Sequence, residues 1–436
     1  MRESAAPGTV RAAILVTGTE VLTGRRQDRN GPWLSERMRE VGAEVTTIAV
    51  VGDHRPEMLA TLRFIAAQQV DLVVTSGGLG PTADDLTTEV VAEAQGRPMA
   101  LDERLEARIA AIVAPLRERF PGIDPTALEA GTRKQATIPA GATVLDPVGT
   151  APGLIVPPGD SAGPLVLVLP GPPRELQPMW RAALEVEPLR SLLARAAPVE
   201  QGLLLLFGIP ESEIAETLRA AESAGIALDR LDVTTCLHRG EIEMATAFAP
   251  AARADYEQLA AFVAERHPKA LFSTDGATVD EQVASRLLAR SLTIATAESC
   301  TGGLLAARLT SLPGSSSYVR GGLVTYANEA KVSLAHVDGR IISEHGAVSR
   351  EVAAGLARGA CDALGADVGV GVTGVAGPGG GSAEKPVGLV WISVTHPRAN
   401  DSLTRSVTLP GSREDVRQRA TTVAMHMVRI LLARES

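Results

Sequence analysis

The sequence predicts an α/β protein built from two to three domains. The chain has 436 residues, and globular domains average about 150 residues. Apolar residues make up 45% of the chain and aromatic residues only 3%, so the cores must consist of Ala, Val, Leu and Ile, as in buried parallel sheets. Short apolar runs alternate with segments of helical spacing. Strand–helix–strand repeats of this kind form parallel sheets with right-handed crossovers.

The first predicted domain spans residues 10–180 and carries a parallel sheet. Apolar runs predict strands at 12–16, 45–51 and 72–75, and the third strand ends in a glycine-rich loop at 76–81. Between the strands, apolar residues recur at the spacing of a buried helix face. These residues are Trp33, Leu34, Met38 and Val41, then Met58, Leu59, Leu62 and Ile65.

Two further domains are predicted from the same patterns. Residues 181–268 form a small α+β module in which we find no chemistry, and we expect it to be a spacer or dimerisation domain. Residues 275–436 form a second α/β domain, whose last helix, from about Arg413, has one apolar stripe that belongs to the core. The predicted elements of the module are 203–207, 211–221, 231–236, 241–248 and 253–266, and those of the third domain are 292–296, 302–310, 319–326, 350–363, 368–372 and 387–394.

Charge and cysteine content argue against several classes of protein. The net charge is −9 and the only tight basic cluster, Arg25, Arg26 and Arg29, is predicted to lie in a loop, whereas nonspecific nucleic-acid binding needs a basic surface. The three cysteines form no CxxC pair, which argues against a disulfide framework or a zinc site. No window approaches about 18 apolar residues, and Met1–Thr9 lacks the pattern of a signal peptide. We therefore expect a cytoplasmic protein that acts on small molecules, without direct nucleic-acid or membrane contact.

The segment Ala297–Gly303 follows a predicted strand and precedes a predicted helix. Ser299 would lie there at the positive end of the helix dipole, beside unpaired backbone N–H groups, which suits a hydroxyl nucleophile or an anion site. Serine and threonine are also preferred helix caps, so a structural role is the alternative. Cys300 is a rival nucleophile, because a thiolate at a helix N-terminus is activated.

Tyr326 and Lys331 follow the strand predicted at 319–326. Both could converge on a hydroxyl group, and a lysine can act as a base when desolvation lowers its pKa. Neither segment contains a histidine, so a Ser-His-Asp triad is not indicated. The alternative for Lys331 is a solvated helix residue.

A third motif, Thr373–Gly381, leaves a predicted strand as a glycine-rich loop. Glycines such as Gly374 and Gly377 let backbone N–H groups approach a phosphate, and open α/β sheets bind ligands at the carboxyl ends of their strands. Lys385 and Arg413 could supply positive charge to that phosphate. The alternative is a flexible surface loop.

The first domain has a candidate site of its own. A glycine-rich loop there leads into two adjacent carboxylates, which could hold a divalent cation on a diphosphate. Acidic residues are also common in the first turn of a helix, and this alternative stays open. The candidate residues are Glu20, Asp28, Asn30, Gly77, Gly78 and Gly80, with Asp84 and Asp85 as metal ligands.

Taken together, the motifs AESCTGG, TYANEAK, EHGAVS and TGVAGPGGG…EKPVG resemble the CinA family of competence/damage-inducible proteins, and the resemblance covers essentially the whole chain. In that family the C-terminal domain is a nicotinamide mononucleotide deamidase that needs no metal or other cofactor. The resemblance implies that Ser299, Tyr326 and Lys331 are catalytic. It also implies that Thr373 and Arg413 lie near the ligand.

The resemblance suggests a mechanism. We expect Ser299 to attack the carboxamide carbon while Lys331, or Tyr326 as its relay, takes the hydroxyl proton. Backbone N–H groups near Thr301, Gly302 and Gly303 would hold the oxyanion, and Thr373 with the glycine loop would seat the ribose phosphate. In an alternative mechanism Ser299 only positions a water molecule.

The first domain resembles the molybdopterin-binding fold at the N-terminus of CinA proteins, through GTEVLTGRRQDRN, SGGLGPTADDLT, KQA, GTAPG and LPGPPREL. The resemblance implies hydrolysis of ADP-ribose to AMP and ribose 5-phosphate with a divalent metal (Mg, Mn or Co) and, in some members, potassium. Two positions depart from the family pattern. Thr19 replaces the acid of Gly-Asp-Glu, and Arg29 replaces the threonine of Asp-Thr-Asn.

Three functions remain as alternatives. The first is an enzyme of pyridine-nucleotide salvage with both activities, and the second is a deamidase with a catalytically silent N-terminal nucleotide-binding domain. The third is a non-catalytic adaptor in competence or the DNA-damage response. We expect a homodimer, because the middle module has no other evident purpose.

Overall fold

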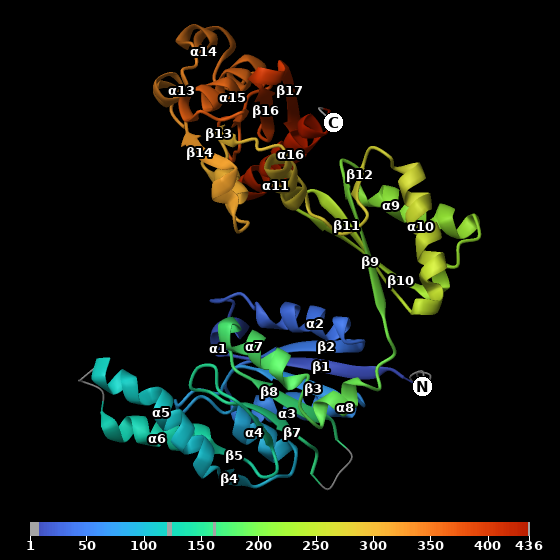
Figure 1. The fold of residues 1–436 in the computed structure, drawn as a ribbon, viewed down its shortest axis with the longest axis vertical. Helices are drawn as coiled ribbons and strands as arrows, with labels where there is room; N and C mark the ends of the chain where they lie inside the picture. Colours follow the sequence, from blue (N-terminus) through green and yellow to red (C-terminus); the bar gives the residue numbers. More distant parts are fainter. Residues whose placement is uncertain (1–7, 120–123, 160–162, 435–436) are drawn as a thin grey trace. The chain divides into compact units, whose positions relative to one another are not determined.

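The computed structural model describes residues 8–119, 124–159 and 163–434. The chain divides into two compact units, Met1–Val199 and Glu200–Ser436, which are described separately (Figure 1).

The first unit is built on a six-stranded sheet with the order β2-β1-β3-β8-β7-β6. The first four strands are parallel, as the strand–helix repeats predict, and β7 and β6 extend them as antiparallel strands, so the sheet is mixed. A separate two-stranded ribbon joins β4 to β5. The strands are β1 (Val10–Thr17), β2 (Ala43–Val51), β3 (Leu72–Ser76), β4 (Met99–Leu101), β5 (Thr137–Pro139), β6 (Thr143–Leu145), β7 (Gly153–Val156) and β8 (Leu165–Leu169).

Helices cover both faces of this sheet. Alternate residues of β1 face opposite cores, because side chains of a strand alternate between its faces: Ile14 packs with Leu34 and Trp180, and Leu15 packs with Met58 and Val90. The helices are α1 (Thr19–Leu22), α2 (Asn30–Glu40), α3 (Arg55–Ala67), α4 (Thr87–Ala94), α5 (Glu103–Arg119), α6 (Pro125–Ala136), α7 (Pro173–Ala183) and α8 (Leu189–Leu193).

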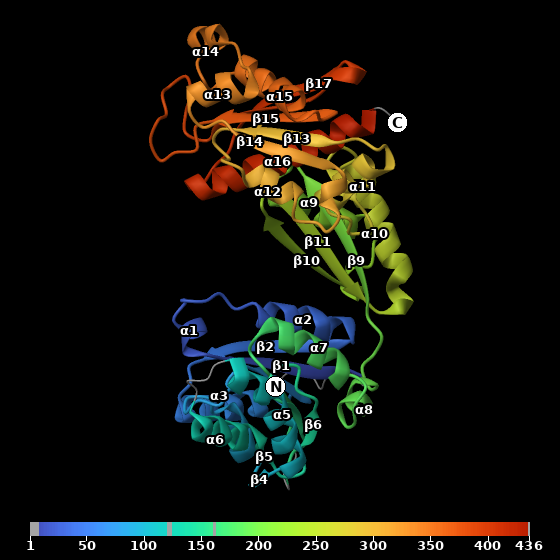
Figure 2. The same ribbon diagram turned by 60° about the vertical axis from the view of Figure 1, so that its left-hand side comes forward.

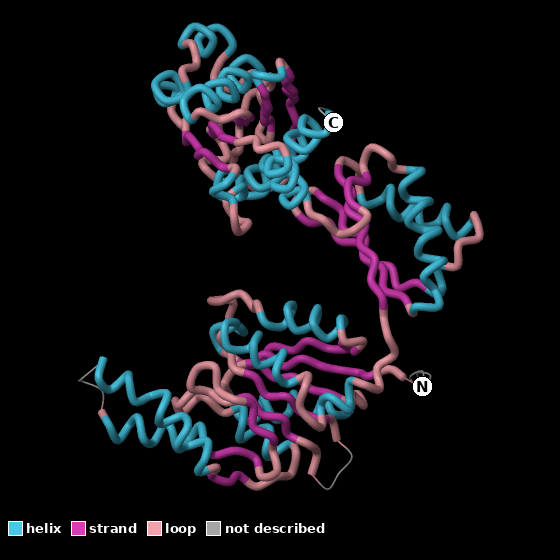
Figure 3. The backbone as a smooth tube through the Cα atoms, viewed as in Figure 1, coloured by secondary structure: helices cyan, strands magenta, loops and turns pink. Residues whose placement is uncertain are grey.

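Two features of the first unit were not predicted from the sequence. The helices α5 and α6 lie side by side as a hairpin that projects beyond the sheet (Figure 3). Leu189 of α8 is fully buried in the same core as Ile14. The first unit therefore continues past residue 180 to Val199.

The second unit begins with the predicted α+β module, a four-stranded sheet in the order β10-β11-β9-β12. The predicted hairpin is confirmed, with antiparallel register from Leu231↔Phe248 to His238↔Glu241. Two helices pack on one face, where Ile214 and Leu259 join the core. The elements are β9 (Glu200–Phe207), α9 (Glu211–Ser223), β10 (Leu231–His238), β11 (Glu241–Phe248), α10 (Arg253–Arg266) and β12 (Leu271–Ser273).

The rest of the second unit is a five-stranded sheet in the order β14-β13-β15-β16-β17 between two helical layers (Figure 2). β14, β13 and β15 are parallel, and β16 and β17 are antiparallel. One layer holds α11 (Val279–Ala289), α12 (Leu304–Leu309) and α16 (Arg413–Arg434), and the other holds α13 (Asn328–Ala335), α14 (Gly339–His345) and α15 (Arg350–Leu364). The strands are β13 (Ile294–Glu298), β14 (Val319–Val324), β15 (Val368–Gly374), β16 (Leu389–His396) and β17 (Asp401–Thr408).

One buried histidine links helix α16 to the four-stranded sheet. The His426 ring on α16 stacks on Phe207 of β9 with a centroid distance of 3.8 Å, and its Nε2 lies 2.6 Å from a carboxylate oxygen of Glu241. Burial lowers the pKa of His426, and Glu241 opposes that shift. No helix in the described part of the chain is both long and apolar enough to cross a membrane.

Candidate functional sites

The C-terminal motifs meet at one edge of the five-stranded sheet. Glu298, the last residue of β13, pairs in register with Val324 of β14 and Val372 of β15. The chain therefore leaves these three parallel strands at the same level. Ser299, the Thr325-Tyr326 pair and the loop after β15 come together there, as the sequence predicts.

Ser299 lies in a tight turn between β13 and α12. Its N–H donates to the carbonyl of Val372 (2.9 Å), and its carbonyl accepts from the N–H of Gly302 (3.1 Å). Gly302 and Gly303 have φ of +60° and +93°, a region that side chains disfavour, so the turn requires glycine. The half-buried Ser299 hydroxyl has no hydrogen-bond partner within the described residues. The backbone therefore places this side chain, and its hydroxyl remains free to react.

The expected oxyanion donors need correction. The N–H of Gly303 donates to the Glu298 carboxylate (2.9 Å), and the N–H of Gly302 is already bound to Ser299. The helix α12 also begins at Leu304, two residues later than predicted. Of the three groups proposed from the sequence, only the Thr301 N–H donates to no carbonyl or carboxylate of the described residues. The Thr301 side-chain oxygen is buried without a partner.

Lys331 is a buried amine, and the solvated alternative is wrong. Its side chain is 1% exposed, and Nζ donates to the carbonyls of Thr325 (3.0 Å) and Tyr326 (3.1 Å). Desolvation lowers the pKa of Lys331, with opposing contributions from Cys300 and Glu329. A neutral amine has two N–H donors and one lone pair. Because the two carbonyls take both donors, the lone pair is free to accept a proton.

Tyr326 is linked to Arg413. The Tyr326 side chain is 59% exposed, and its phenolic oxygen accepts a hydrogen bond from Arg413 Nη2 (2.8 Å). The other arm of the guanidinium donates to the carbonyl of Gly377 (2.8 Å). Because Arg413 already donates to the phenolic oxygen, the phenolic O–H is available as a donor. The Tyr326 oxygen thus already accepts a hydrogen bond, whereas Lys331 Nζ only donates in the described contacts.

Thr373 and Lys385 both hold the glycine-rich loop against the segment before α15. The Thr373 hydroxyl donates to the carbonyl of Ala347 (2.7 Å), and Lys385 Nζ donates to the carbonyl of His345 (2.8 Å). A Cβ at Gly374 would lie 2.6 Å from the carbonyl oxygen of Leu389. These residues therefore organise the loop in this structure, and a role in holding phosphate stays a prediction.

Cys300 does not fit the role of rival nucleophile. Its side chain is 5% exposed, and burial raises the pKa of its thiol to about 12. The thiol is therefore protonated at neutral pH, because burial outweighs the favourable N–H groups of the turn.

In the first unit, the predicted residues line two adjoining cavities. One cavity, of about 410 Å³, is lined by the glycine loop and by five carboxylates. The other, of about 660 Å³, is lined by Asp28 and Asn30 and also by Arg26 and Arg29. Both cavities share Glu20. The carboxylates of the first cavity are Glu20, Asp53, Asp84, Asp85 and Glu175.

Asp84 and Asp85 are oriented by Thr82. The N–H of Thr82 donates to Oδ2 of Asp85 (3.0 Å), and its single hydroxyl proton is shared between Oδ1 of Asp84 and Oδ2 of Asp85. The hydrogen bond from Thr82 lowers the pKa of Asp84. The second oxygen of each carboxylate keeps its capacity for a cation. In residues 8–119, 124–159 and 163–434, no three His, Cys, Asp or Glu side chains are placed to hold a metal. A role for the pair in holding a divalent cation stays a prediction.

Asp28 and Asn30 shape the second cavity. Asp28 Oδ1 accepts from the N–H groups of Asn30 (2.9 Å) and Gly31 (3.0 Å) at the start of α2. The Asn30 amide donates to the Ser76 hydroxyl (2.8 Å) and to the carbonyl of Gly171 (2.6 Å). Both side chains thus order the backbone around the cavity. The second carboxylate oxygen of Asp28 accepts no hydrogen bond from the described residues, and a role in ligand binding stays a prediction.

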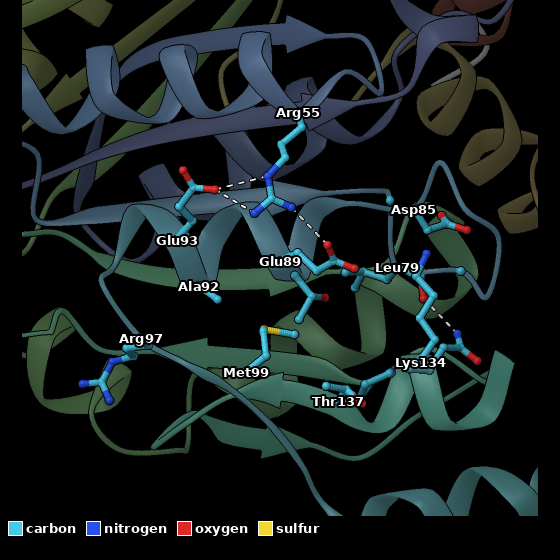
Figure 4. A pocket seen from close by; sticks show the side chains of 15 residues that line it. Arg55, Leu79, Asp85, Glu89, Ala92, Glu93, Arg97, Met99, Lys134 and Thr137 are labelled. Carbon is cyan, nitrogen blue, oxygen red and sulfur yellow. Dashed lines mark hydrogen bonds and ion pairs between the residues drawn. The ribbon is translucent and has the colours of Figure 1, made fainter. Parts of the chain in front are cut away.

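A third cavity, of about 450 Å³, lies against the same glycine loop (Figure 4). Leu79, Ala92 and Met99 contribute apolar surface to it, and Arg55 pairs with Glu89 and Glu93 of α4. It shares part of its wall with the carboxylate-lined cavity. The shared residues are Gly78, Leu79, Gly80, Asp85 and Gln135.

Sequence reasoning missed several residues of both sites. Glu298 lies in the AESCTGG motif, but the sequence does not show that its carboxylate accepts hydrogen bonds from α12. Arg417 donates to the carbonyl of Thr301 (2.8 Å) and lies one helical turn beyond Arg413, a spacing that was readable once Arg413 had been chosen. Gln135 donates to the carbonyl of Leu79 (2.8 Å), and only the tertiary structure brings these two segments together.

Comparison with known proteins agrees with this architecture. Residues 276–432 match the family model of the CinA C-terminal domain, and residues 13–190 match that of a probable molybdopterin binding domain. A CinA-like protein of Mycolicibacterium vanbaalenii is 53% identical over 421 residues, which cover 97% of this chain and 98% of that protein. A CinA-like protein of Mycobacterium tuberculosis is 53% identical over 428 residues, which cover 98% of each chain.

A solved structure is similar to part of the chain. The competence/damage inducible protein CihA from Agrobacterium tumefaciens is 39% identical, covering 35% of this chain and 94% of its own, with a TM-score of 0.34. The two family models define a protein that joins a molybdopterin-binding-type domain to a CinA C-terminal domain. With full-length relatives at 53% identity, this chain belongs to the CinA family.

Proposed function

We propose that the C-terminal domain hydrolyses the carboxamide of nicotinamide mononucleotide to nicotinate mononucleotide and ammonia, without a metal. The observation that supports this most is Lys331, a buried amine whose two carbonyl contacts leave its lone pair free. Such an amine is a base suited to activating a serine. Ser299 follows the strand next to the one that precedes Lys331, and its hydroxyl has no competing partner in the described structure.

In the proposed mechanism, Ser299 Oγ attacks the carboxamide carbon while Lys331 Nζ takes the hydroxyl proton. The Thr301 N–H, which faces the Cys300 sulfur in the structure, and the Tyr326 phenol are the proposed donors for the developing oxyanion. When the tetrahedral intermediate collapses, the C–N bond breaks and Lys331 returns the proton to the leaving ammonia. Water then attacks the acyl-serine and releases the carboxylate. The alternative, in which Ser299 only positions water, forms no acyl-serine.

Arg413 is the proposed cation for the substrate phosphate. Its guanidinium is exposed and bridges the Tyr326 phenol and the carbonyl of Gly377. Arginine forms strong charge-assisted hydrogen bonds to phosphate. Thr373, Gly374 and the following loop would seat the ribose phosphate beside it, with Lys385 anchoring the loop.

A second activity is proposed for the N-terminal domain, namely hydrolysis of ADP-ribose to AMP and ribose 5-phosphate. The carboxylate-lined cavity adjoins one lined by Arg26 and Arg29, whose side chains form no ion pair within the described residues. This pairing suits a diphosphate ester. Asp84 and Asp85 would hold a divalent cation, which, when bound, neutralises charge on the diphosphate. Potassium stays an additional proposal.

The remaining expectations are also proposals. We propose a cytoplasmic homodimer in pyridine-nucleotide salvage that binds no nucleic acid directly. A silent N-terminal domain is the alternative if no AMP forms. The adaptor role in competence or DNA damage would be favoured if neither activity is found.

The test of the C-terminal assignment is ammonia release from nicotinamide mononucleotide by the full chain and by Ser299→Ala. We expect the parent to release ammonia and the variant to lose several orders of magnitude, as removal of a nucleophile does. Ser343→Ala, on the exposed side of α14, is the control and should match the parent. A folded parent that releases no ammonia would refute the proposal.

A further inference from the structure

Glu298 is a fully buried carboxylate directly before the candidate nucleophile. It is 0% exposed and accepts four hydrogen bonds. The Thr296 hydroxyl (3.0 Å) and the N–H of Ala306 (2.8 Å) donate to Oε1, and the N–H groups of Gly303 (2.9 Å) and Leu305 (3.0 Å) donate to Oε2. Such a contact set satisfies both oxygens of a carboxylate, which only accepts hydrogen bonds.

These contacts cap α12 from the preceding strand. The first N–H groups of a helix have no partner inside the helix, and here the N-cap is Gly303, which has no side chain to supply one. The Glu298 carboxylate supplies the missing hydrogen-bond acceptors, and its negative charge lies at the positive end of the helix. The site where the sequence suggested an external anion is therefore filled by the protein's own carboxylate.

The same contacts close the turn that carries Ser299. The strand side of the turn is fixed where Ser299 N–H binds Val372, and the helix side is fixed where Gly303, Leu305 and Ala306 bind Glu298. Since the Ser299 hydroxyl has no partner of its own, its direction depends on this backbone. A six-residue helix has little stability of its own to hold the turn.

We infer that Glu298 is a positioning residue, whose carboxylate holds the Ser299 turn in the geometry needed for attack on the carboxamide. This inference rests on the proposed deamidase function. Within the described residues, the Glu298 carboxylate forms no hydrogen bond or ion pair with Lys331, Tyr326 or Arg413. Loss of the Glu298 carboxylate should therefore slow the chemical step and leave substrate binding unchanged.

The test is Glu298→Gln in the full chain, with kcat and KM for nicotinamide mononucleotide measured separately. The amide nitrogen of glutamine is a donor and would face other donors, so at least one of the four hydrogen bonds is lost. We expect kcat to fall about 100-fold, as small misplacements of a reacting group do, and KM to stay nearly unchanged.

Glu281→Gln is the matched control. Glu281 forms a capping box with Thr278 at the start of α11, in the same domain. A glutamine can still accept the hydrogen bonds of a capping box, so this variant should keep both the helix cap and the kcat of the parent. An equal fall in kcat in both variants, or a folded Glu298→Gln with the parent's kcat, would overturn the inference.

Amide hydrogen exchange separates this inference from the proposed function. Exchange in residues 299–306 should be faster in Glu298→Gln than in the parent and unchanged in Glu281→Gln, whether or not the parent releases ammonia. Unchanged exchange at 299–306 would show that Glu298 does not hold the turn. If Glu298→Gln does not fold, Thr296→Val removes one of the four donors. It should lower kcat by a smaller factor at constant KM, and an unaltered kcat would count against the inference.

Discussion

The two candidate sites use opposite electrostatics. Near Ser299, one buried amine has lost the solvent that would stabilise its charge, and the buried Glu298 carboxylate is fully occupied by three backbone N–H groups and the Thr296 hydroxyl. In the N-terminal domain, five carboxylates line one cavity and two arginines line the cavity beside it. In the proposed mechanism, the first site supplies its own base. The second gathers negative charge, which a diphosphate substrate tolerates only with a cation present.

The largest expected effect is at Lys331. Lys331→Met keeps an apolar chain of similar length but removes the base, so ammonia release should fall about 100- to 10,000-fold. AMP release by the N-terminal domain should not change. Steady-state assays of both products on one preparation provide the measurement. Ammonia release that survives this change would remove Lys331 from the mechanism.

A reciprocal loss is expected in the N-terminal domain. Asp84→Asn with Asp85→Asn removes the negative charge proposed to hold the divalent cation, so AMP release should fall about 100-fold, corresponding to about 2.7 kcal/mol of lost transition-state stabilisation. Ammonia release serves as the internal control and should be unaffected. If AMP forms at the parent's rate, the cation is held elsewhere.

Tyr326→Phe should have a smaller effect. It removes one neutral hydrogen-bond donor and the acceptor for Arg413, and the expected loss in kcat/KM is about 10-fold. A loss as large as that of Lys331→Met would instead indicate that Tyr326 relays the proton.

The pH dependence of ammonia release should reflect the lowered pKa of Lys331. The neutral amine is the active form, so kcat/KM should rise with pH and level off above that pKa. Burial moves the pKa down from its usual 10.5, which brings the plateau to lower pH. A rise centred at or above 10.5 would contradict the desolvated base.

The smallest predicted effect concerns stability. The pKa of His426 is lowered in the folded chain, so below its usual 6.5 the unfolded chain binds a proton that the folded chain resists. Stability should therefore be retained above that pH and decrease as the pH falls through it. Glu241, Arg429 and Arg308 surround the ring. Urea unfolding of His426→Phe at about pH 7.5 and 5.5 should show a weaker pH dependence than the parent, and an unchanged dependence would exclude His426 as its source.

The sequence predicted the parts of the fold that repeat local patterns. The central strands, the α10 and α15 helices and the hairpin β10–β11 follow from apolar spacing and a turn signal. Three other features do not follow from local patterns, because their packing depends on distant segments. They are the hairpin of α5 and α6, the edge strand β17 and the continuation of the first unit to Val199.

The candidate sites likewise contain features that local patterns predict and features that depend on tertiary contacts. Ser299, Tyr326 and Lys331 were singled out because each follows a predicted strand, and their catalytic roles were implied by the resemblance to the CinA family. The structure brings the ends of these strands to one edge of the sheet, and the catalytic roles stay predictions. The N–H groups of Gly302 and Gly303 were misassigned, because the sequence does not show that Ser299 and Glu298 accept from them. Likewise, burial of Cys300 reverses the effect that a helix N-terminus has on a thiol.

The most direct test of the difference between the two sites is to measure ammonia and AMP release from one preparation of the full chain, with and without a metal chelator. Nicotinamide mononucleotide and ADP-ribose would be supplied together. We predict that the chelator leaves ammonia release unchanged and abolishes AMP release. Loss of ammonia release on chelation would contradict the proposal that Lys331 and Ser299 suffice for the C-terminal chemistry.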